Sequence, residues 1–196
     1  MIRIAVTGDI GSGKSYIARL FGYPVFNADL EVSKLYKKSK KCYFKLKKEL
    51  PNYIFSFPIK KKELSKAIIS EEKNLKKIIN IVHPEIRKKM TNFEKKNNKR
   101  KIIILDIPLL IENKINKKKD IIVFVDATKK EISKRLKKRV NFNLKIVKKL
   151  KKFQLPLELK KKKSDFIIKN NFNNNSFKKN VKVLKNKILS NARSYT

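Results

Sequence analysis

Short apolar runs alternate along the chain with longer segments whose apolar positions recur every three or four residues. The runs are typical of buried strands, because they are rich in Ile and Val and end at turn-forming or charged residues. They cover residues 2–7, 24–26, 102–105, 121–125 and 166–168. Apolar strands separated by helices form parallel sheets that are covered on both faces. The pattern therefore predicts an α/β fold with a five-stranded parallel sheet.

Helical periodicity accounts for most of the remaining chain. The predicted helices cover residues 15–21, about 37–100, 128–136, 140–163 and 181–189. The stretch 37–100 is rich in Lys and carries apolar faces, for example Leu75, Ile78 and Val82. Such a long helical stretch between two strands indicates an insertion into the α/β core.

The segment between the first strand and the first helix is rich in glycine. It matches the phosphate-loop (P-loop) pattern G-x-x-x-x-G-K-[ST] in full, as Gly8-Asp9-Ile10-Gly11-Ser12-Gly13-Lys14-Ser15. Three of the four glycines of the chain lie in it. Glycines let backbone N–H groups surround phosphates, and the following helix adds a favourable dipole. Lys14 is expected to bridge the β- and γ-phosphates of a nucleotide, and the Ser15 hydroxyl to bind Mg²⁺.

Two aspartates follow predicted strands and have two interpretations each. Asp29 either accepts the proton of an attacking hydroxyl group or caps the next helix. Asp106 ends the apolar run 102–105, which is typical of a Walker-B carboxylate that holds Mg²⁺. The alternative for Asp106 is a turn residue at the end of a strand.

Two pairs of basic residues are four positions apart, which places each pair on one helical face. His83 and Arg87 are a candidate cationic pair for a phosphorylated substrate, although His83-Pro84 is also typical of a helix start. Arg135 and Arg139 are candidates for a lid that closes over the transferred phosphoryl group. A solvated helical face explains the arginines equally well, because Lys137 lies between them.

Composition restricts the protein class. The 196 residues are 41% hydrophobic, which is normal for a folded domain. Cys42 is the only cysteine, so no internal disulfide can form and a reducing compartment is expected. No apolar run reaches the roughly 18 residues of a membrane span. We therefore expect a cytoplasmic enzyme with no membrane partner, either a monomer or a weak homo-oligomer.

The formal net charge of +37 has two interpretations. One is nucleic-acid binding through phosphate neutralisation. The other is compositional drift toward Lys, Asn and Ile. Only seven of the 53 basic residues are Arg, the residue whose fork matches phosphate geometry, and Lys occurs in nearly every predicted helix. We therefore expect no specific nucleic-acid partner.

Taken in chain order, these motifs resemble the dephospho-CoA kinase family, P-loop kinases that phosphorylate the 3′-hydroxyl of dephospho-CoA. The similar segments are residues 6–15, 27–29, 83–87, 105–112 and 164–170, together with Arg135, Arg139 and Gln154. The segment 105–112, Leu-Asp-Ile-Pro-Leu-Leu-Ile-Glu, is the most family-specific of them.

The resemblance implies a three-layer P-loop kinase fold, ATP and Mg²⁺ as cofactors, and dephospho-CoA as substrate. The implied catalytic residues are Lys14, Asp29 and Arg139, and Mg²⁺ would be held by Ser15 and Asp106. The implied nucleotide contacts are Gly8, Gly11, Ser12, Gly13, Lys14, Ser15, Tyr16 and Arg135. The implied substrate contacts are Asp29, His83, Arg87, Leu109 and Glu112.

The same resemblance implies three parts of the chain. A nucleotide-binding core is expected from residues 1–29, 99–134 and 161–196, a helical CoA-binding insertion from 30–98, and a lid from 135–160. Several positions depart from the family pattern: Asp9, Asn27, Lys61, Val140, Phe166 and Lys169. Two alternatives stay open at this point, namely another metabolite or nucleoside P-loop kinase, and a basic P-loop protein that binds nucleic acid.

Overall fold

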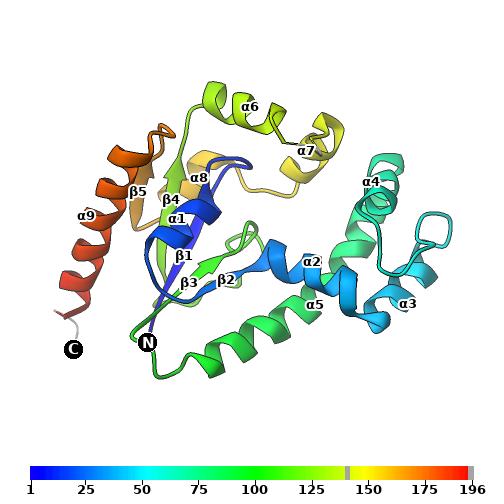
Figure 1. The fold of residues 1–196 in the computed structure, drawn as a ribbon, viewed down its shortest axis with the longest axis horizontal. Coiled ribbons are helices and arrows are strands. Elements are labelled where there is room, and N and C mark those ends of the chain that lie inside the picture. Colours follow the sequence, from blue (N-terminus) through cyan, green and yellow to red (C-terminus); the bar gives the residue numbers. More distant parts are fainter. Residues whose placement is uncertain (140–141, 194–196) are drawn as a thin grey trace. The chain divides into compact units, whose positions relative to one another are not determined.

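The structure, a computed structural model, describes residues 1–139 and 142–193. It divides into two compact units (Figure 1). The sheet unit comprises Met1–Phe26, Lys99–Phe142 and Gln154–Thr196. The helical unit comprises Asn27–Asn98 and Asn143–Phe153. Each unit has its own core and is described by itself.

The sheet unit is built on five strands in the order β2-β3-β1-β4-β5. The strands are β1 (Ile2–Gly8), β2 (Val25–Asn27), β3 (Ile102–Asp106), β4 (Ile121–Asp126) and β5 (Phe166–Lys169). β1 pairs in parallel with β3 and β4, and β4 pairs in parallel with β5. The predicted five-stranded parallel sheet is therefore confirmed. Each strand lies within a residue or two of its predicted position.

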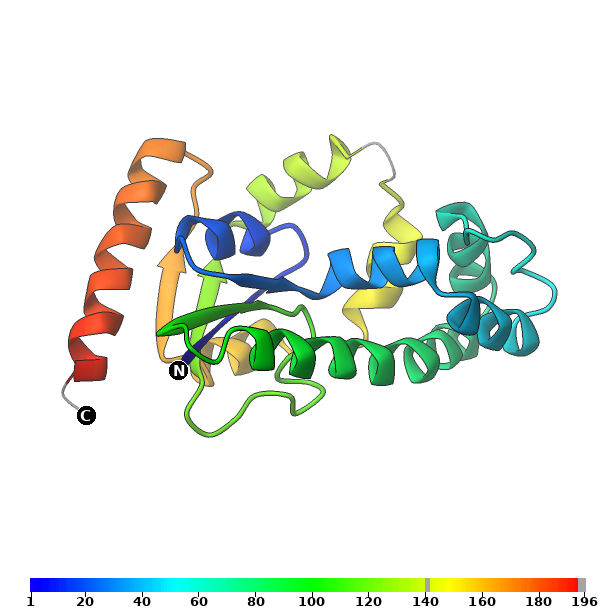
Figure 2. The ribbon, with the colours of Figure 1, turned by 60° about the horizontal axis from the view of Figure 1, so that its bottom comes forward.

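Helices cover the sheet on both faces, which produces the expected three layers (Figure 2). α1 (Lys14–Leu20) and α9 (Asn174–Arg193) contribute apolar residues to one core with strand residues such as Ile4 and Val6. α8 (Leu157–Lys162) contacts β1. Alternate residues of a strand point to opposite faces, so strands buried on both sides need apolar residues at every position.

The helical unit contains α2 (Ala28–Lys38), α3 (Lys40–Glu49), α4 (Lys61–Ser70), α5 (Glu72–Lys96) and α7 (Leu144–Lys151). α5 contacts α2, α3 and α4. Its buried residues Leu75, Ile78, Val82 and Ile86 are spaced at three or four positions and form one apolar face. The predicted helical insertion therefore folds around one long amphipathic helix.

α7 is attached to the helical unit by two lysines. The Lys149 Nζ donates to the carbonyl oxygens of Ile68 and Ile69, each at 2.7 Å, near the C-terminus of α4. Lys152 forms an ion pair of 2.9 Å with Glu72. Cations are favourable at helix C-termini, where carbonyl groups lack helical partners. The neighbouring α6 (Lys129–Lys137) and α8 instead belong to the sheet unit.

Two helix-start interpretations were wrong. α2 begins at Ala28, and its cap is the Asn27 side chain, which accepts a hydrogen bond of 2.7 Å from the Leu30 N–H. Asp29 lies in the first turn and does not cap the helix. His83 and Pro84 lie inside α5 rather than at its start. Packing along the long apolar face offsets the cost of an internal proline, which sequence alone does not weigh.

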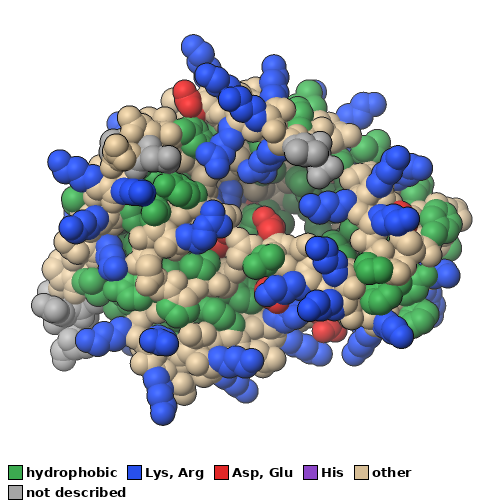
Figure 3. All heavy atoms as spheres, viewed as in Figure 1, with side chains coloured by type: hydrophobic (Ala, Val, Ile, Leu, Met, Phe, Trp, Pro, Cys, Tyr) green, Lys and Arg blue, Asp and Glu red, His purple; other side chains and the backbone are tan. Residues whose placement is uncertain are grey.

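Basic side chains are scattered over the visible face of the protein. Lys and Arg side chains project from elements throughout the picture and do not form a single stripe (Figure 3). This distribution agrees with the spread of Lys along the sequence. Among the described helices, none combines the length and the apolar character needed to cross a bilayer.

Candidate active site

The P-loop connects β1 to α1 in a conformation that depends on glycine. Gly8 and Gly13 have φ angles of 143° and 97°, which side-chain-bearing residues rarely adopt. A Cβ on Gly8 would lie 2.7 Å from the Val125 carbonyl oxygen, and one on Gly13 would lie 2.5 Å from the Asn170 Nδ2. The glycines therefore permit both the turn and its close contact with the edge of the sheet.

Lys14 is held inside the loop. Only 8% of the residue is exposed, and its Nζ donates to the carbonyl oxygens of Asp9 at 2.7 Å and of Gly8 at 3.3 Å. Those carbonyls hold the ammonium group at the centre of the loop. The fold thus fixes a buried cation within the loop.

Asp9 shapes the same turn. Its Oδ1 accepts a hydrogen bond of 2.6 Å from the Ile10 N–H, and its carbonyl oxygen accepts one of 3.2 Å from the Ser12 N–H. Asp9 is buried, with 5% of the residue exposed. The loop therefore contains a buried acidic residue as well as the buried Lys14.

Asn170 supports the loop from the end of β5, and sequence reasoning gave it no role of its own. Its Nδ2 donates to the Ser12 carbonyl oxygen at 2.8 Å, and its N–H donates to the Asp126 carbonyl oxygen at 2.7 Å. Its Oδ1 accepts from the Phe172 N–H at 2.8 Å. The signals in the sequence were its place just after a predicted strand, at the edge where ligands bind, and its position at the end of the family-like segment 164–170.

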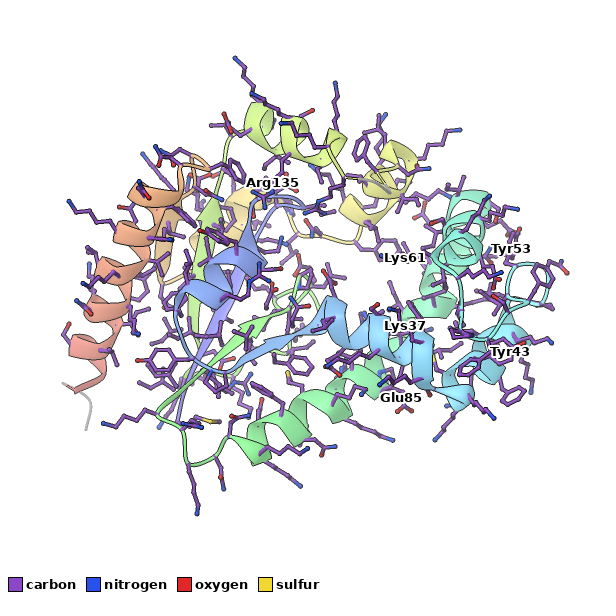
Figure 4. The ribbon with its side chains drawn as sticks, in the orientation of Figure 1. Lys37, Tyr43, Tyr53, Lys61, Glu85 and Arg135 are labelled. Carbon is purple, nitrogen blue, oxygen red and sulfur yellow. The ribbon has the colours of Figure 1, made fainter. Side chains whose placement is uncertain are left out.

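Arg135 projects from α6 toward the loop that follows β5 (Figure 4). Its guanidinium carbon lies 5.0 Å from the centre of the Phe172 ring, a distance suited to cation–π attraction. The next residue, Leu136, is buried, and its side chain lies about 3 Å from an ideal Cβ on Gly11. α6 therefore packs on the P-loop and carries Arg135 beside it. Arg139 is exposed just beyond the end of α6.

Two oxygen-bearing residues suit a Mg²⁺ ion by their chemistry. Asp106 ends β3 with 2% of the residue exposed, and the register pairs it with Val6 in β1. Ser15 lies in the first turn of α1, at the end of the P-loop. Mg²⁺ prefers oxygen ligands, usually one or two from the protein and the rest from phosphates and water.

Tyr16 was expected to contact the nucleotide. In the structure its ring instead stacks on Phe177, with the ring centroids 6.0 Å apart.

The turn after β3 carries Leu109 and Glu112, which the resemblance assigned to substrate binding. Leu109 is half-buried. The Glu112 Oε1 lies 2.6 Å from the Nζ of Lys160 and accepts a hydrogen bond of 3.1 Å from the Leu155 N–H. Lys160 is completely buried. Sequence reasoning missed this ion pair, because Lys160 begins a run of four lysines that looks like a solvated face.

The remaining candidates lie in the helical unit. Asp29 is exposed in the first turn of α2. His83 is half-buried and Arg87 exposed, one turn apart on α5. Burial, with a smaller contribution from Arg87, lowers the pKa of His83. The imidazole is therefore uncharged at neutral pH, and Arg87 alone supplies the positive charge of this pair.

The structure gives some departures from the family pattern a physical role. Asn27 caps α2, a position where Asn and Asp are about equally favourable. Phe166 begins β5, with the Lys187 ammonium 5.8 Å from its ring centre. Lys61 is the exposed first residue of α4 (Figure 4). Val140 lies outside the described residues.

Comparison with known proteins gives consistent results. A model of the family described as Dephospho-CoA kinase matches residues 2–176. A relative of that name from Wolbachia pipientis wMel is 36% identical over 170 residues, which cover 84% of this chain and 87% of the relative. Another from Rickettsia typhi (strain ATCC VR-144 / Wilmington) is 30% identical over 190 residues, covering 95% and 97%.

Solved structures show the same fold. The Thermus thermophilus protein TT1252 has a TM-score of 0.75 at 26% identity, with 97% of each chain covered. A dephospho-CoA kinase from Campylobacter jejuni has a TM-score of 0.62 at 23% identity, covering 95% of this chain and 96% of that one. The P-loop kinase fold is thus confirmed. Because the family match spans most of the sequence and a relative at 36% identity covers over four fifths of it, this chain belongs to the dephospho-CoA kinase family.

Proposed function

We propose that this protein transfers the γ-phosphoryl group of ATP to the ribose 3′-hydroxyl of dephospho-CoA, giving CoA and ADP. The observation that carries the proposal is the buried Lys14 at the centre of a supported P-loop, in a chain whose family match extends through residue 176. Phosphoryl transfer depends on positioning and on charge stabilisation, with little covalent chemistry for the protein. A preformed loop with a fixed cation meets the first of these needs.

The sheet unit would bind ATP. The loop backbone from Gly8 through Gly11, Ser12 and Gly13 would surround the phosphates, and Lys14 would contact the β- and γ-phosphates. Ser15 and Asp106 would hold Mg²⁺, which neutralises phosphate charge when it is bound. Arg135 would contact the nucleotide beside the loop. Tyr16 would hold the first turn of α1 in place through its stacking on Phe177.

Two further residues would act on the transferred group. Asp29 would orient the 3′-hydroxyl and accept its proton, because a carboxylate within reach of an attacking hydroxyl serves as a general base. Arg139 would stabilise the charge that develops on the transferring phosphoryl group. Asn27, and not Asp29, caps α2.

His83, Arg87, Leu109 and Glu112 would contact dephospho-CoA. Arg87 would attract its phosphates, whereas the uncharged His83 would act through hydrogen bonding. Glu112 has a more restricted role, because its Oε1 is already used by Lys160 and Leu155. Its buried Oε2 has no hydrogen-bond partner among the described residues and could accept one from the substrate.

The test is a coupled assay of ADP release with dephospho-CoA, a panel of nucleosides and shikimate as acceptors. Among these acceptors, we expect turnover only with dephospho-CoA. Phosphorus NMR of the product should show that the new phosphate is at the 3′ position. Turnover with a nucleoside and none with dephospho-CoA would contradict the proposal. Product phosphorylated at the 2′ position would contradict the assignment of the acceptor hydroxyl.

A further inference from the structure

The P-loop of this protein contains an acidic side chain at a place built for anions. Phosphate loops bind their ligand with backbone N–H groups and a lysine, and a carboxylate among them repels the same ligand. Asp9 is nevertheless buried in the loop, and its backbone carbonyl oxygen accepts a hydrogen bond from Lys14. The loop therefore holds a carboxylate together with the lysine that is expected to bind the phosphates.

The contacts hold the Asp9 carboxylate within the loop. Its Oδ1 occupies the N–H of Ile10 at 2.6 Å, so this donor is already used by an internal anion. Its carbonyl oxygen receives the Lys14 ammonium at 2.7 Å and the Ser12 N–H at 3.2 Å. With both ends of the residue bound, the carboxylate cannot leave the loop unless these bonds break.

We propose that Asp9 makes the loop selective for a nucleotide whose charge is partly neutralised by a divalent cation, and that it discriminates against metal-free ATP. The inference rests on the proposed function, since it concerns how the same loop accepts ATP. The fixed carboxylate repels every phosphate group nearby. That repulsion is larger for metal-free ATP, because Mg²⁺ removes part of the triphosphate charge. Burial of Asp9 strengthens the effect, because solvent and salt screen a buried charge less.

Asp9→Asn tests the effect of the charge, because Asn has nearly the same shape as Asp. The amide keeps an oxygen that accepts from the Ile10 N–H and removes the negative charge. Asp9→Gly removes the side chain altogether and serves as a second variant if the first folds poorly. Glu158→Gln is the matched control, because it makes the same change of charge at an exposed position of α8 in the same unit.

The experiment is isothermal calorimetry at constant ionic strength with the full chain, using ATP in excess Mg²⁺ and ATP in EDTA. Thermal melting confirms that each variant is folded. We expect both Asp9 variants to bind metal-free ATP about tenfold more tightly or better, with a smaller change for Mg²⁺·ATP. The ratio of the two dissociation constants should stay as in the unmodified protein for Glu158→Gln.

The possible results are distinct. An unchanged ratio in the folded Asp9 variants would overturn the inference and leave Asp9 as a turn residue. Weaker binding of Mg²⁺·ATP by Asp9→Asn would also overturn it, since Asp9 would then be assisting the cation rather than repelling the phosphates. Equal affinity of the unmodified protein for both forms would overturn it without any variant. Failure of the unmodified protein to bind Mg²⁺·ATP would instead contradict the proposed function.

Discussion

Several candidate residues of the sheet unit are deeply buried, whereas none of the candidates in the helical unit is. In the sheet unit Lys14, Asp106 and Asn170 are buried, with at most 8% of each residue exposed. In the helical unit Asp29 and Arg87 are exposed and His83 is half-buried. These buried groups are thus held by packing and hydrogen bonds, although Arg135 and Arg139 of the same unit are exposed. The candidates of the helical unit lie on helix surfaces, whereas Leu109 and Glu112 are half-buried in the sheet unit.

This difference has a physical consequence. Groups that are already immobilised lose little conformational entropy when the ligand binds and need not reorganise during the reaction. Exposed side chains on helices must be ordered by the substrate itself, at a cost of rotamer freedom. We therefore expect changes in the sheet unit to affect stability and nucleotide binding together. Changes in the helical unit should affect the acceptor step with little loss of stability.

The largest effect on stability is expected for the buried ion pair of the sheet unit. Lys160→Met leaves the Glu112 carboxylate buried without its cation and should lower the free energy of unfolding by about 3–5 kcal/mol. Lys152→Met removes an exposed pair in the helical unit, where the side chains are 63% and 47% exposed, and should leave the free energy of unfolding nearly unchanged. Urea denaturation followed by circular dichroism measures both. Similar costs for the two variants would remove the contrast between the units.

Lys14→Ala should lower kcat by about 10²-fold or more, because it removes a preorganised charge from the phosphate loop. The fold should persist, since the hydrogen bonds from Lys14 to the Gly8 and Asp9 carbonyl oxygens lie outside the hydrophobic core. The measurement is the coupled assay, with Lys130→Ala on the exposed surface of α6 as control. Full activity in a folded Lys14→Ala protein would reject the P-loop assignment.

Asp29→Asn should lower kcat by about 10²-fold with little change in the KM for ATP, because the amide cannot accept a proton. The melting temperature should change little, since Asn27 and not Asp29 caps α2. This outcome would show that Asp29 contributes to catalysis without contributing to stability, unlike the buried residues of the sheet unit. An active variant would leave Asp29 without a catalytic role.

Asn27→Ala tests the opposite case on the same helix. Loss of the hydrogen bond to the Leu30 N–H should destabilise the protein by about 1 kcal/mol. A shift of about 2–4 °C in the melting temperature corresponds to that loss. Asn27→Asp keeps a capping oxygen and should restore stability. If Asn27→Ala melted like the unmodified protein, the cap would contribute nothing measurable.

The smallest effect concerns pH. Burial lowers the pKa of His83 from its ordinary value of 6.5, so the unfolded chain binds the proton more tightly than the folded chain. This contribution to stability is present above about pH 6.5 and is lost as the pH falls through the lowered pKa. His83→Gln should flatten the fall in melting temperature between pH 7 and about 5, by no more than about 2–4 °C. The lowered pKa values of Glu31, Glu63 and Glu72 also reduce stability toward pH 5, but they do so equally in the unmodified protein and in the variant, so the difference between the two profiles reports on His83. An identical pH profile for the variant would show that His83 does not contribute.

Much of the fold could be predicted because its signals are local. Runs of Ile and Val located all five strands, and the spacing of the glycines located the P-loop. Helix boundaries were less certain, as Asn27 and Pro84 show. A cap depends on which of two neighbouring polar residues reaches the first N–H groups, and a proline inside a helix depends on packing along the rest of that helix.

The linear pattern of residues was thus enough to establish the five-stranded α/β fold, the phosphate loop and the family resemblance. Long-range packing was needed to establish which residues support the loop and which charges are buried. Asn170 meets Ser12 across 158 residues, and Glu112 meets Lys160 from a different element. The same packing places α7 with the helical unit, through Lys149 and the end of α4. Periodicity and motif spacing depend on neighbours along the chain, whereas these contacts form only when the strand order and helix packing bring distant segments together.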